Sequence, residues 1–237
     1  MFFQWAVDTA NEEEACKDID CVFVSDFFNK RVNDPPTMPG LDASHQQVPM
    51  QRVMESLGSD TNRQNFAILW GSVNLNKAQL WQNRKARADN TWEDYATNDL
   101  NKATEVIRDS IAVYQYLRDS KMWGKFKAIN KGVRAEMLRA QEQYNKDNDK
   151  DSKLQDCWDA WLKHKLGDDG KKWVTDAMED LKTKHKPEDS SEDDPLGHEL
   201  YDALTTILDL LATEAGEAIK ISNFDLGLDD DAMDTSD

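Results

Sequence analysis

The sequence predicts an all-α fold, an irregular multi-helix bundle with two long antiparallel helices and an acidic, flexible C-terminal tail. The first observation behind this prediction is that apolar residues recur every three or four positions over several long segments, the spacing of an amphipathic helix. The second is that the prolines and the longest charge runs fall between these segments. The third is that most of the excess negative charge lies in the last third of the chain.

The prediction divides the chain into five parts. They are an irregular N-terminal segment (1–48), a helical core domain (49–184), an acidic linker (185–195), a C-terminal helix (196–222) and a disordered acidic tail (223–237). Within the first part, the sequence CVFVSDFF is compatible with either a buried strand or a helical turn, because periodicity does not separate the two in so short a run. Residues 33–49 hold four prolines and one glycine, which predicts a loop.

The helical core begins with two segments. A first helix is expected to start near Pro49, a tolerated first-turn position, and to end at Gly58. A second helix is expected over residues 62–82, because Phe66, Leu69, Trp70, Val73 and other apolar residues lie mostly at helical spacing. The competing interpretation for FAILW (66–70) is a β-strand, and Gly71 weakens the helix.

The two long helices are expected over residues 94–119 and 121–147. Their apolar faces comprise Leu100, Ala103, Val106, Ile107, Ile111, Tyr114 and Leu117 in the first, and Met122, Phe126, Ile129, Val133, Met137 and Tyr144 in the second. A short connection between long helices favours antiparallel packing. Shorter helices follow, one lined by Leu154, Trp158, Trp161 and Leu162 and another by Trp173, Val174, Ala177, Met178 and Leu181.

The charge distribution narrows the classes of partner. The net charge is −17, with 18 basic and 20 acidic residues in 1–144 but 11 basic and 26 acidic residues in 145–237. Nucleic-acid binding is disfavoured, because phosphate contacts need clustered Lys and Arg. An anionic membrane surface is disfavoured for the same reason. The acidic third is compatible with a basic protein partner and with simple solubility.

No stretch of the sequence is apolar enough for a membrane span, and the N-terminus does not resemble a signal peptide. A cytoplasmic location is expected, or secretion if the chain is a piece of a longer precursor. The three cysteines are too few for a disulfide scaffold. Cys16 and Cys21 could pair if the protein were secreted, and Cys157 is expected to be a small core residue.

We find no pattern of residues that predicts catalysis, a metal or a cofactor. There is no nucleophile elbow, no phosphate-binding loop and no zinc-ligand spacing. Asp147, Asp149 and Asp151 have the spacing of a calcium-binding loop, but Ser152 occupies the glycine position and Trp158 the glutamate position. An enzyme whose site forms only in three dimensions stays open as an alternative.

The eight tryptophans suggest carbohydrate binding, since sugars stack on exposed indole rings. Trp92, in the polar segment DNTWEDY, is the best candidate platform, followed by Trp81 and Trp123. Core packing is the alternative for each of them. Trp70, Trp158, Trp161 and Trp173 are weaker candidates.

Two segments carry a resemblance to a known family. RVMESLGSDTNRQNFAILWGSVNLNKAQLW and VIRDSIAVYQYLRDSKMWGKF, with LGSDTN at 57–62 and AVYQYL at 112–117, resemble the region downstream of the catalytic barrel in fungal class V chitinases of the killer-toxin-subunit type. The resemblance covers roughly residues 50–145. The family's chemistry lies in a barrel that this chain does not contain, so the resemblance carries over no catalytic residue.

The resemblance implies a non-catalytic accessory or interaction domain, whose partner is a chitinase-like catalytic domain or another protein. Two alternatives remain. The first is a chitin-binding module that uses exposed tryptophans. The second is a fragment of a chitinase-related glycoside hydrolase that lacks its catalytic barrel.

Overall fold

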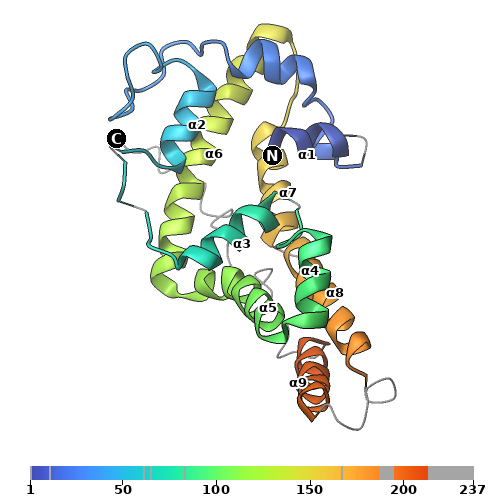
Figure 1. Ribbon diagram of the computed structural model, residues 1–237. Coiled ribbons are helices and arrows are strands. Elements are labelled where there is room, and N and C mark those ends of the chain that lie inside the picture. The colour runs from blue at the N-terminus through green and yellow to red at the C-terminus, as the bar shows by residue number, and fades with distance from the viewer. Residues whose placement is uncertain are drawn as a thin grey trace. The chain divides into compact units, whose positions relative to one another are not determined.

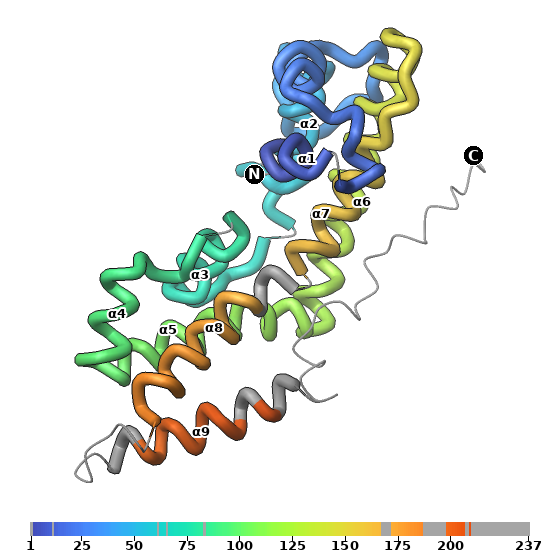
Figure 2. The backbone as a smooth tube through the Cα atoms, turned by 90° about the vertical axis from the view of Figure 1, so that its right-hand side faces the viewer, coloured from blue at the N-terminus to red at the C-terminus, as the bar shows by residue number. Residues whose placement is uncertain are grey.

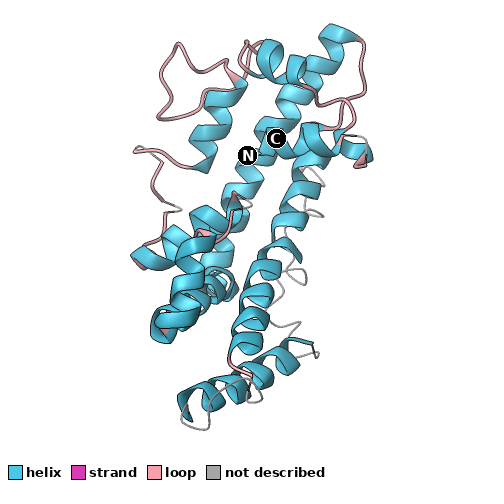
Figure 3. Cartoon of the chain, turned by 45° about the vertical axis from the view of Figure 1, so that its right-hand side comes forward, coloured by secondary structure: helices cyan, strands magenta, loops and turns pink. Residues whose placement is uncertain are grey.

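The structure, a computed structural model, describes residues 2–186, except Asn11, Thr61, Asn65, Asn83 and Gly167, and residues 195–212. These residues form helices joined by loops and contain no strand, which confirms the predicted all-α class (Figure 3). They divide into two compact units. Of the described residues, those in 1–67 and 120–163 form unit 1, and those in 68–119 and 164–224 form unit 2. Residues 225–237, also assigned to unit 1, lie outside the described range.

Unit 1 is built around the long helix α6 (Ser120–Asn148), against which α2 (Pro49–Leu57) packs (Figure 1). The predicted bounds of both helices agree closely with the observed ones. The N-terminal segment, expected to be irregular, contains α1 (Phe2–Thr9), a 3-10 turn η1 (Glu14–Cys16) and a π-helical turn η2 (Phe23–Phe28). CVFVSDFF is therefore helical and not a strand. Most of α7 (Leu154–Leu166) completes the unit.

Aromatic side chains fill the core where the N-terminal turns meet α6 and α7. The ring of Phe2 contacts Trp158 edge-on, with centroids 5.2 Å apart, and Phe23 contacts Tyr144 in the same way at 4.7 Å. Edge-to-face pairs at these distances are favourable beyond the area that they bury. Trp158 also donates a hydrogen bond from Nε1 to Asn130 Oδ1 at 2.8 Å. Trp158 is therefore a core residue with its polar atom satisfied.

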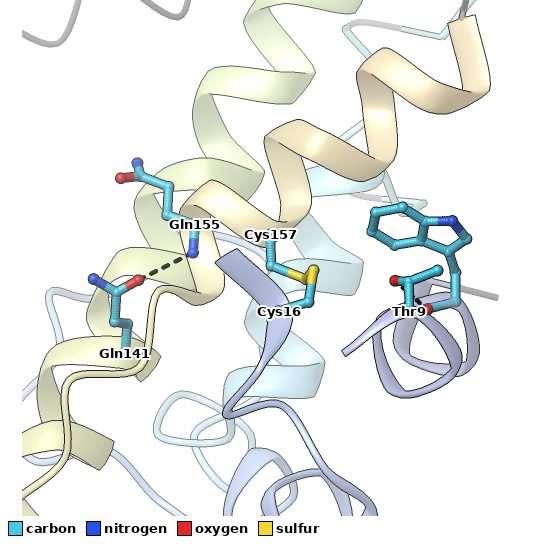
Figure 4. The surroundings of a disulfide bond; sticks show 6 residues. Thr9, Cys16, Gln141, Gln155 and Cys157 are labelled. Carbon is cyan, nitrogen blue, oxygen red and sulfur yellow. Dashed lines mark hydrogen bonds between the residues drawn. A yellow bond between two sulfur atoms is a disulfide. The ribbon is translucent and has the colours of Figure 1, made fainter. Parts of the chain in front are cut away.

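A disulfide joins Cys16 in η1 to Cys157 in α7, with Cα atoms 4.9 Å apart (Figure 4). Both cysteines are fully buried, whereas Cys21 is exposed and forms no disulfide. The pairing of Cys16 with Cys21 considered from the sequence is therefore wrong, whereas Cys157 is buried in the core as expected and is, in addition, disulfide-bonded. The bridge spans 141 positions of sequence, so short-range spacing carries no signal for it.

A buried ion pair connects α2, α6 and residues 33–48, which we call the proline-rich loop. The Arg52 guanidinium donates from Nε and Nη2 to the two carboxylate oxygens of Glu136, at 2.5 and 3.0 Å. Its Nη1 donates to the carbonyl oxygens of Pro36 and Gln46, at 3.1 and 2.8 Å. The side chains of Arg52 and Glu136 are only 2% and 8% exposed. This one side chain thus holds residues 33–48, predicted to be a loop, against the helices.

A second buried pair lies between α6 and α7. Arg134 Nε lies 3.1 Å from Asp159 Oδ1 and 3.2 Å from Oδ2, and its hydrogen bond goes to Oδ2; Oδ1 is buried and accepts no hydrogen bond from the described residues. Burial raises the pKa of Asp159 to about 6, and the Arg134 charge offsets only part of that rise.

This raised pKa predicts a pH-dependent contribution to stability. Because the folded chain keeps a proton on Asp159 that the unfolded chain releases, the contribution is complete below pH 3.8 and is lost as the pH rises through about 6. The shift corresponds to about 3 kcal/mol. Urea unfolding of the wild type and of Asp159→Asn between pH 4 and 7 measures it. The stability difference, wild type minus variant, should fall across this window, and a flat difference would contradict the assignment.

Unit 2 consists of α3 (Gly71–Trp81), α4 (Asp89–Asn98), α5 (Leu100–Gln115), a 3-10 turn η3 (Tyr116–Arg118), α8 (Asp168–Lys184) and α9 (Pro195–Ala212). In Figure 2, α4, α5 and α8 lie side by side, with α9 next to α8. Their shared core comprises Ala96, Ala103, Ile107, Val174, Ala177, Met178, Leu181 and Leu204. Residues 185–186 follow α8, whereas residues 187–194 of the predicted linker and residues 213–237 lie outside the described range.

Two predicted helices need correction. The helix expected over 94–119 is divided at Asp99, whose φ of −145° and ψ of 75° are not helical. The Asp99 carboxylate accepts a hydrogen bond from Lys102 N, so it caps α5 where α4 has ended. The helix expected over 62–82 begins only at Gly71, and the described residues of 62–70 are not helical. The antiparallel packing of the two long helices stays a prediction.

Candidate interaction site

Large apolar side chains that the described structure leaves exposed are concentrated in one stretch of sequence. Of the seven, six lie between residues 54 and 75, namely Met54, Leu57, Phe66, Ile68, Trp70 and Leu75, and the seventh is Val22. Ile68 is fully exposed, Trp70 is 78% exposed and Phe66 is 51% exposed. We call residues 66–70 the apolar segment. These residues are close in sequence, and the first stretch of unit 1 ends at residue 67 while unit 2 begins at residue 68. Contiguous exposed apolar groups, unlike scattered ones, are typical of interaction sites.

The backbone of the apolar segment is open to a partner. The N–H of Phe66 donates to the carbonyl oxygen of Arg63, and the carbonyl oxygen of Trp70 accepts from Asn74 N at the start of α3. Between these two residues, the backbone groups of Ala67, Ile68 and Leu69 form no hydrogen bond with any described residue. Three consecutive residues therefore offer both donors and acceptors.

Contacts within unit 1 fix where the apolar segment begins. Lys125 Nζ, on α6, donates to the carbonyl oxygens of Gln64 and Phe66, at 2.8 and 3.0 Å. The Phe66 ring lies on Gly58, where a Cβ would be only 2.0 Å from the ring carbon Cε1. Gly58 also has a φ of +128°, which favours glycine. Because Gly58, at the end of α2, has no side chain, the Phe66 ring can lie against it.

The three tryptophans predicted to bind sugar lie on three different helices. Trp92 on α4 is half-buried: its Nε1 donates to Asp180 Oδ2 at 2.8 Å, and its ring contacts Trp173 edge-on at 5.6 Å. Trp123 on α6 is 8% exposed and stacks on Phe126 at 5.0 Å. Trp81 ends α3 and is half-buried. Intramolecular packing therefore uses much of the Trp92 and Trp123 ring surface that a sugar would need.

Trp70 is the most exposed tryptophan for which the structure gives a side-chain exposure. The sequence grouped it with Phe66, Leu69 and Val73 on one helix face, where it would be buried. The available signals against that helix were Gly71 and the polar run before Phe66, both of which favour a loop.

The described residues contain no group of three or more His, Cys, Asp or Glu side chains placed to hold a metal ion. No helix within the described range is long and apolar enough to cross a membrane. The apolar segment contains aromatic and aliphatic side chains, backbone groups that form no hydrogen bond with the described residues, and no titratable side chain.

Comparison of the chain with protein-family models, with curated proteins and with solved structures gives no match.

Proposed function

We propose that the protein is a non-catalytic accessory module that binds a protein partner through the apolar segment. The observation that carries this proposal is the exposure of Phe66, Ile68 and Trp70 next to backbone groups that form no hydrogen bond with the described residues. Burying such side chains contributes roughly 25 cal/mol per Å² of apolar surface removed from water. Binding of a partner would therefore bury apolar surface that the described residues leave in water, and this burial would stabilise the complex.

The chemistry of the segment defines the partner surface that fits it. Residues 64–76 contain no charged side chain, although 32% of the whole chain is charged. Interface cores are depleted in charged residues and enriched in aromatic ones. Extended peptides bind partners by pairing backbone groups while alternate side chains enter pockets. The partner is accordingly an apolar groove whose edge presents backbone donors and acceptors.

The resemblance to class V chitinases supplies a candidate partner. The apolar segment lies inside the stretch RVMESLGSDTNRQNFAILWGSVNLNKAQLW that carries this resemblance. A chitinase-like catalytic domain, on the same precursor or on a separate chain, is therefore the first partner to test.

Binding to the immobilised catalytic domain of a fungal class V chitinase tests this partner. We expect the wild type to bind and Ile68→Asp or Trp70→Ser to weaken binding by about tenfold or more, because central anchors dominate interface energies. Ile68 and Trp70 are both exposed, so neither substitution should disturb folding. The matched control is Val22→Asp, at a 62% exposed apolar residue outside the segment. Absence of wild-type binding, or equal weakening by Val22→Asp, would reject the partner.

The second candidate function is chitin binding. It is favoured by the 78% exposure of Trp70, since sugars stack on exposed indole rings. Retention of the wild type on insoluble chitin, with loss of retention in Trp70→Ser but not in Val22→Asp, would support this alternative. Trp92→Ala in the same assay tests the sugar platform predicted from the sequence.

A further inference from the structure

A second feature lies in unit 1, away from the apolar segment in the sequence. A cavity of about 240 Å³ opens between the start of the proline-rich loop and the C-terminal half of α6, and its walls are Val32, Asn33, Asp34, Pro35, Arg139, Glu142, Gln143 and Lys146. We propose that this cavity binds a small zwitterion of the amino-acid class, with a carboxylate on Arg139 and an ammonium group between Asp34 and Glu142. This proposal does not depend on the proposed function.

The walls of the cavity are held in place before any ligand arrives. Asn33 N donates to Gln143 Oε1 at 3.3 Å, and Gln143 Nε2 donates to both carboxylate oxygens of Asp147 at 2.8 Å. Val32 N donates to the carbonyl oxygen of Gln47 at 2.7 Å, which closes the base of the loop. A site fixed in this way loses little conformational entropy on binding.

The backbone at the cavity mouth is strained. Asp34 has a φ of +44°, in the left-handed region, and it precedes Pro35, which further restricts its conformation. A residue held in such a conformation costs about 1–3 kcal/mol and persists because its surroundings impose it, most often at functional sites. The strain places an acidic residue on the loop wall, opposite the α6 residues of the cavity.

Arg139 has unused hydrogen-bonding capacity. Its Nε is buried and forms no hydrogen bond with the described residues, and Glu136 Oε1, its ion-pair partner, is 3.6 Å away. That carboxylate already accepts two hydrogen bonds from Arg52. Guanidinium groups bind carboxylates through paired, charge-assisted hydrogen bonds. The Arg139 side chain is nevertheless 41% exposed and lines the cavity, so its terminal nitrogens, and not the buried Nε, are the donors that would meet a ligand carboxylate.

The mixture of charges selects a zwitterion over a simple ion. Asp34, Glu142, Arg139 and Lys146 all line the cavity, yet the described structure contains no ion pair among them. A lone anion would meet the two carboxylates, and a lone cation would meet the two basic groups. Like-charge contacts of this kind oppose binding, whereas a molecule with both charges complements each pair.

The volume sets the size of the ligand. It is below the ~300–1,000 Å³ of sites that take drug-sized molecules, but it is several times the ~30 Å³ that one water occupies in the liquid. A single amino acid with a small side chain fits this range, and a sugar chain or a peptide does not.

Titration of the full-length protein with L-alanine, followed by calorimetry and by the amide signals of Asn33 and Gln143, tests the proposal. We expect saturable binding of L-alanine, with acetate and methylammonium binding at least about tenfold more weakly. Arg139→Gln should raise the Kd of L-alanine at least about tenfold, because it removes the charge but keeps a polar side chain.

The matched control is Arg84→Gln, at an exposed arginine of unit 2, which should leave the Kd unchanged. Circular dichroism of each variant checks that the fold persists. The proposal is overturned if L-alanine does not bind, if acetate or methylammonium binds as tightly, or if folded Arg139→Gln keeps the wild-type affinity. A further variant, Ile68→Asp, should bind L-alanine normally, which separates this site from the apolar segment.

Discussion

Replacing Cys16 by Ser is expected to lower the free energy of unfolding by roughly 4–5 kcal/mol. The reason is that the disulfide with Cys157 closes a loop across 141 positions of sequence, and the entropy that a cross-link removes from the unfolded chain grows with loop length. Much of the net stability of a typical domain, about 5–15 kcal/mol, would be lost. Urea unfolding under non-reducing conditions measures the change, and Cys157→Ser should give a similar loss.

Cys21→Ser is the matched control, because Cys21 is exposed and outside the bridge. It should leave the unfolding midpoint unchanged. Alkylation of the denatured, unreduced protein followed by mass spectrometry should label Cys21 alone. Labelling of all three cysteines, or a bridge that includes Cys21, would contradict the pairing.

Arg52→Met is expected to destabilise the protein by about 3–5 kcal/mol, because it removes the bidentate partner of the buried Glu136 carboxylate and leaves only the more distant Arg139 Nε, at 3.6 Å, to compensate its charge. The carbonyl oxygens of Pro36 and Gln46 lose their donor in the same variant. The double variant Arg52→Met/Glu136→Leu should recover a large part of this loss, since no uncompensated charge stays buried. Chemical unfolding of the two single variants and the double variant gives the coupling energy.

Lys85→Met tests an exposed ion pair for comparison. Lys85 bonds to Asp89 with both side chains largely exposed, so its removal should cost less than about 1 kcal/mol. Equal effects of Lys85→Met and Arg52→Met would show that burial does not determine the strength of the Arg52–Glu136 pair.

The helices that the sequence predicts best are those whose boundaries have local signals. The bounds of α2 follow from Pro49 at its first turn and Gly58 after its last residue. The predicted range of α6 differs from the observed one by a single residue at each end. Its apolar residues recur over many turns, and the acidic run DNDKD (147–151) begins in its last turn. The break at Asp99 in the predicted 94–119 helix is not evident from the sequence, although Asp is a common N-cap residue. The reason is that the apolar residues keep their helical spacing on both sides of Asp99.

The candidate sites depend on relations that short-range patterns do not contain. FAILW has the apolar spacing of a helix, but its Phe66, Ile68 and Trp70 side chains are exposed, and its first carbonyl group accepts a hydrogen bond from Lys125, 59 positions away. The cavity brings Asp34 near Arg139, which are on separate elements far apart in the sequence. Spacing within a window of one or two helical turns predicts elements, but it does not predict which of them meet.

Hydrogen exchange at the apolar segment tests the central claim most directly, because it needs no partner. The amides of Ala67, Ile68 and Leu69 form no hydrogen bond with the described residues, whereas Val133 and Met137 lie buried within α6. We predict that the three segment amides exchange at close to the rate of an unstructured peptide, while those of Val133 and Met137 are strongly protected. Protection of Ala67–Leu69 comparable to that of α6 in the isolated protein would contradict the account, because it would mean that the segment is already paired.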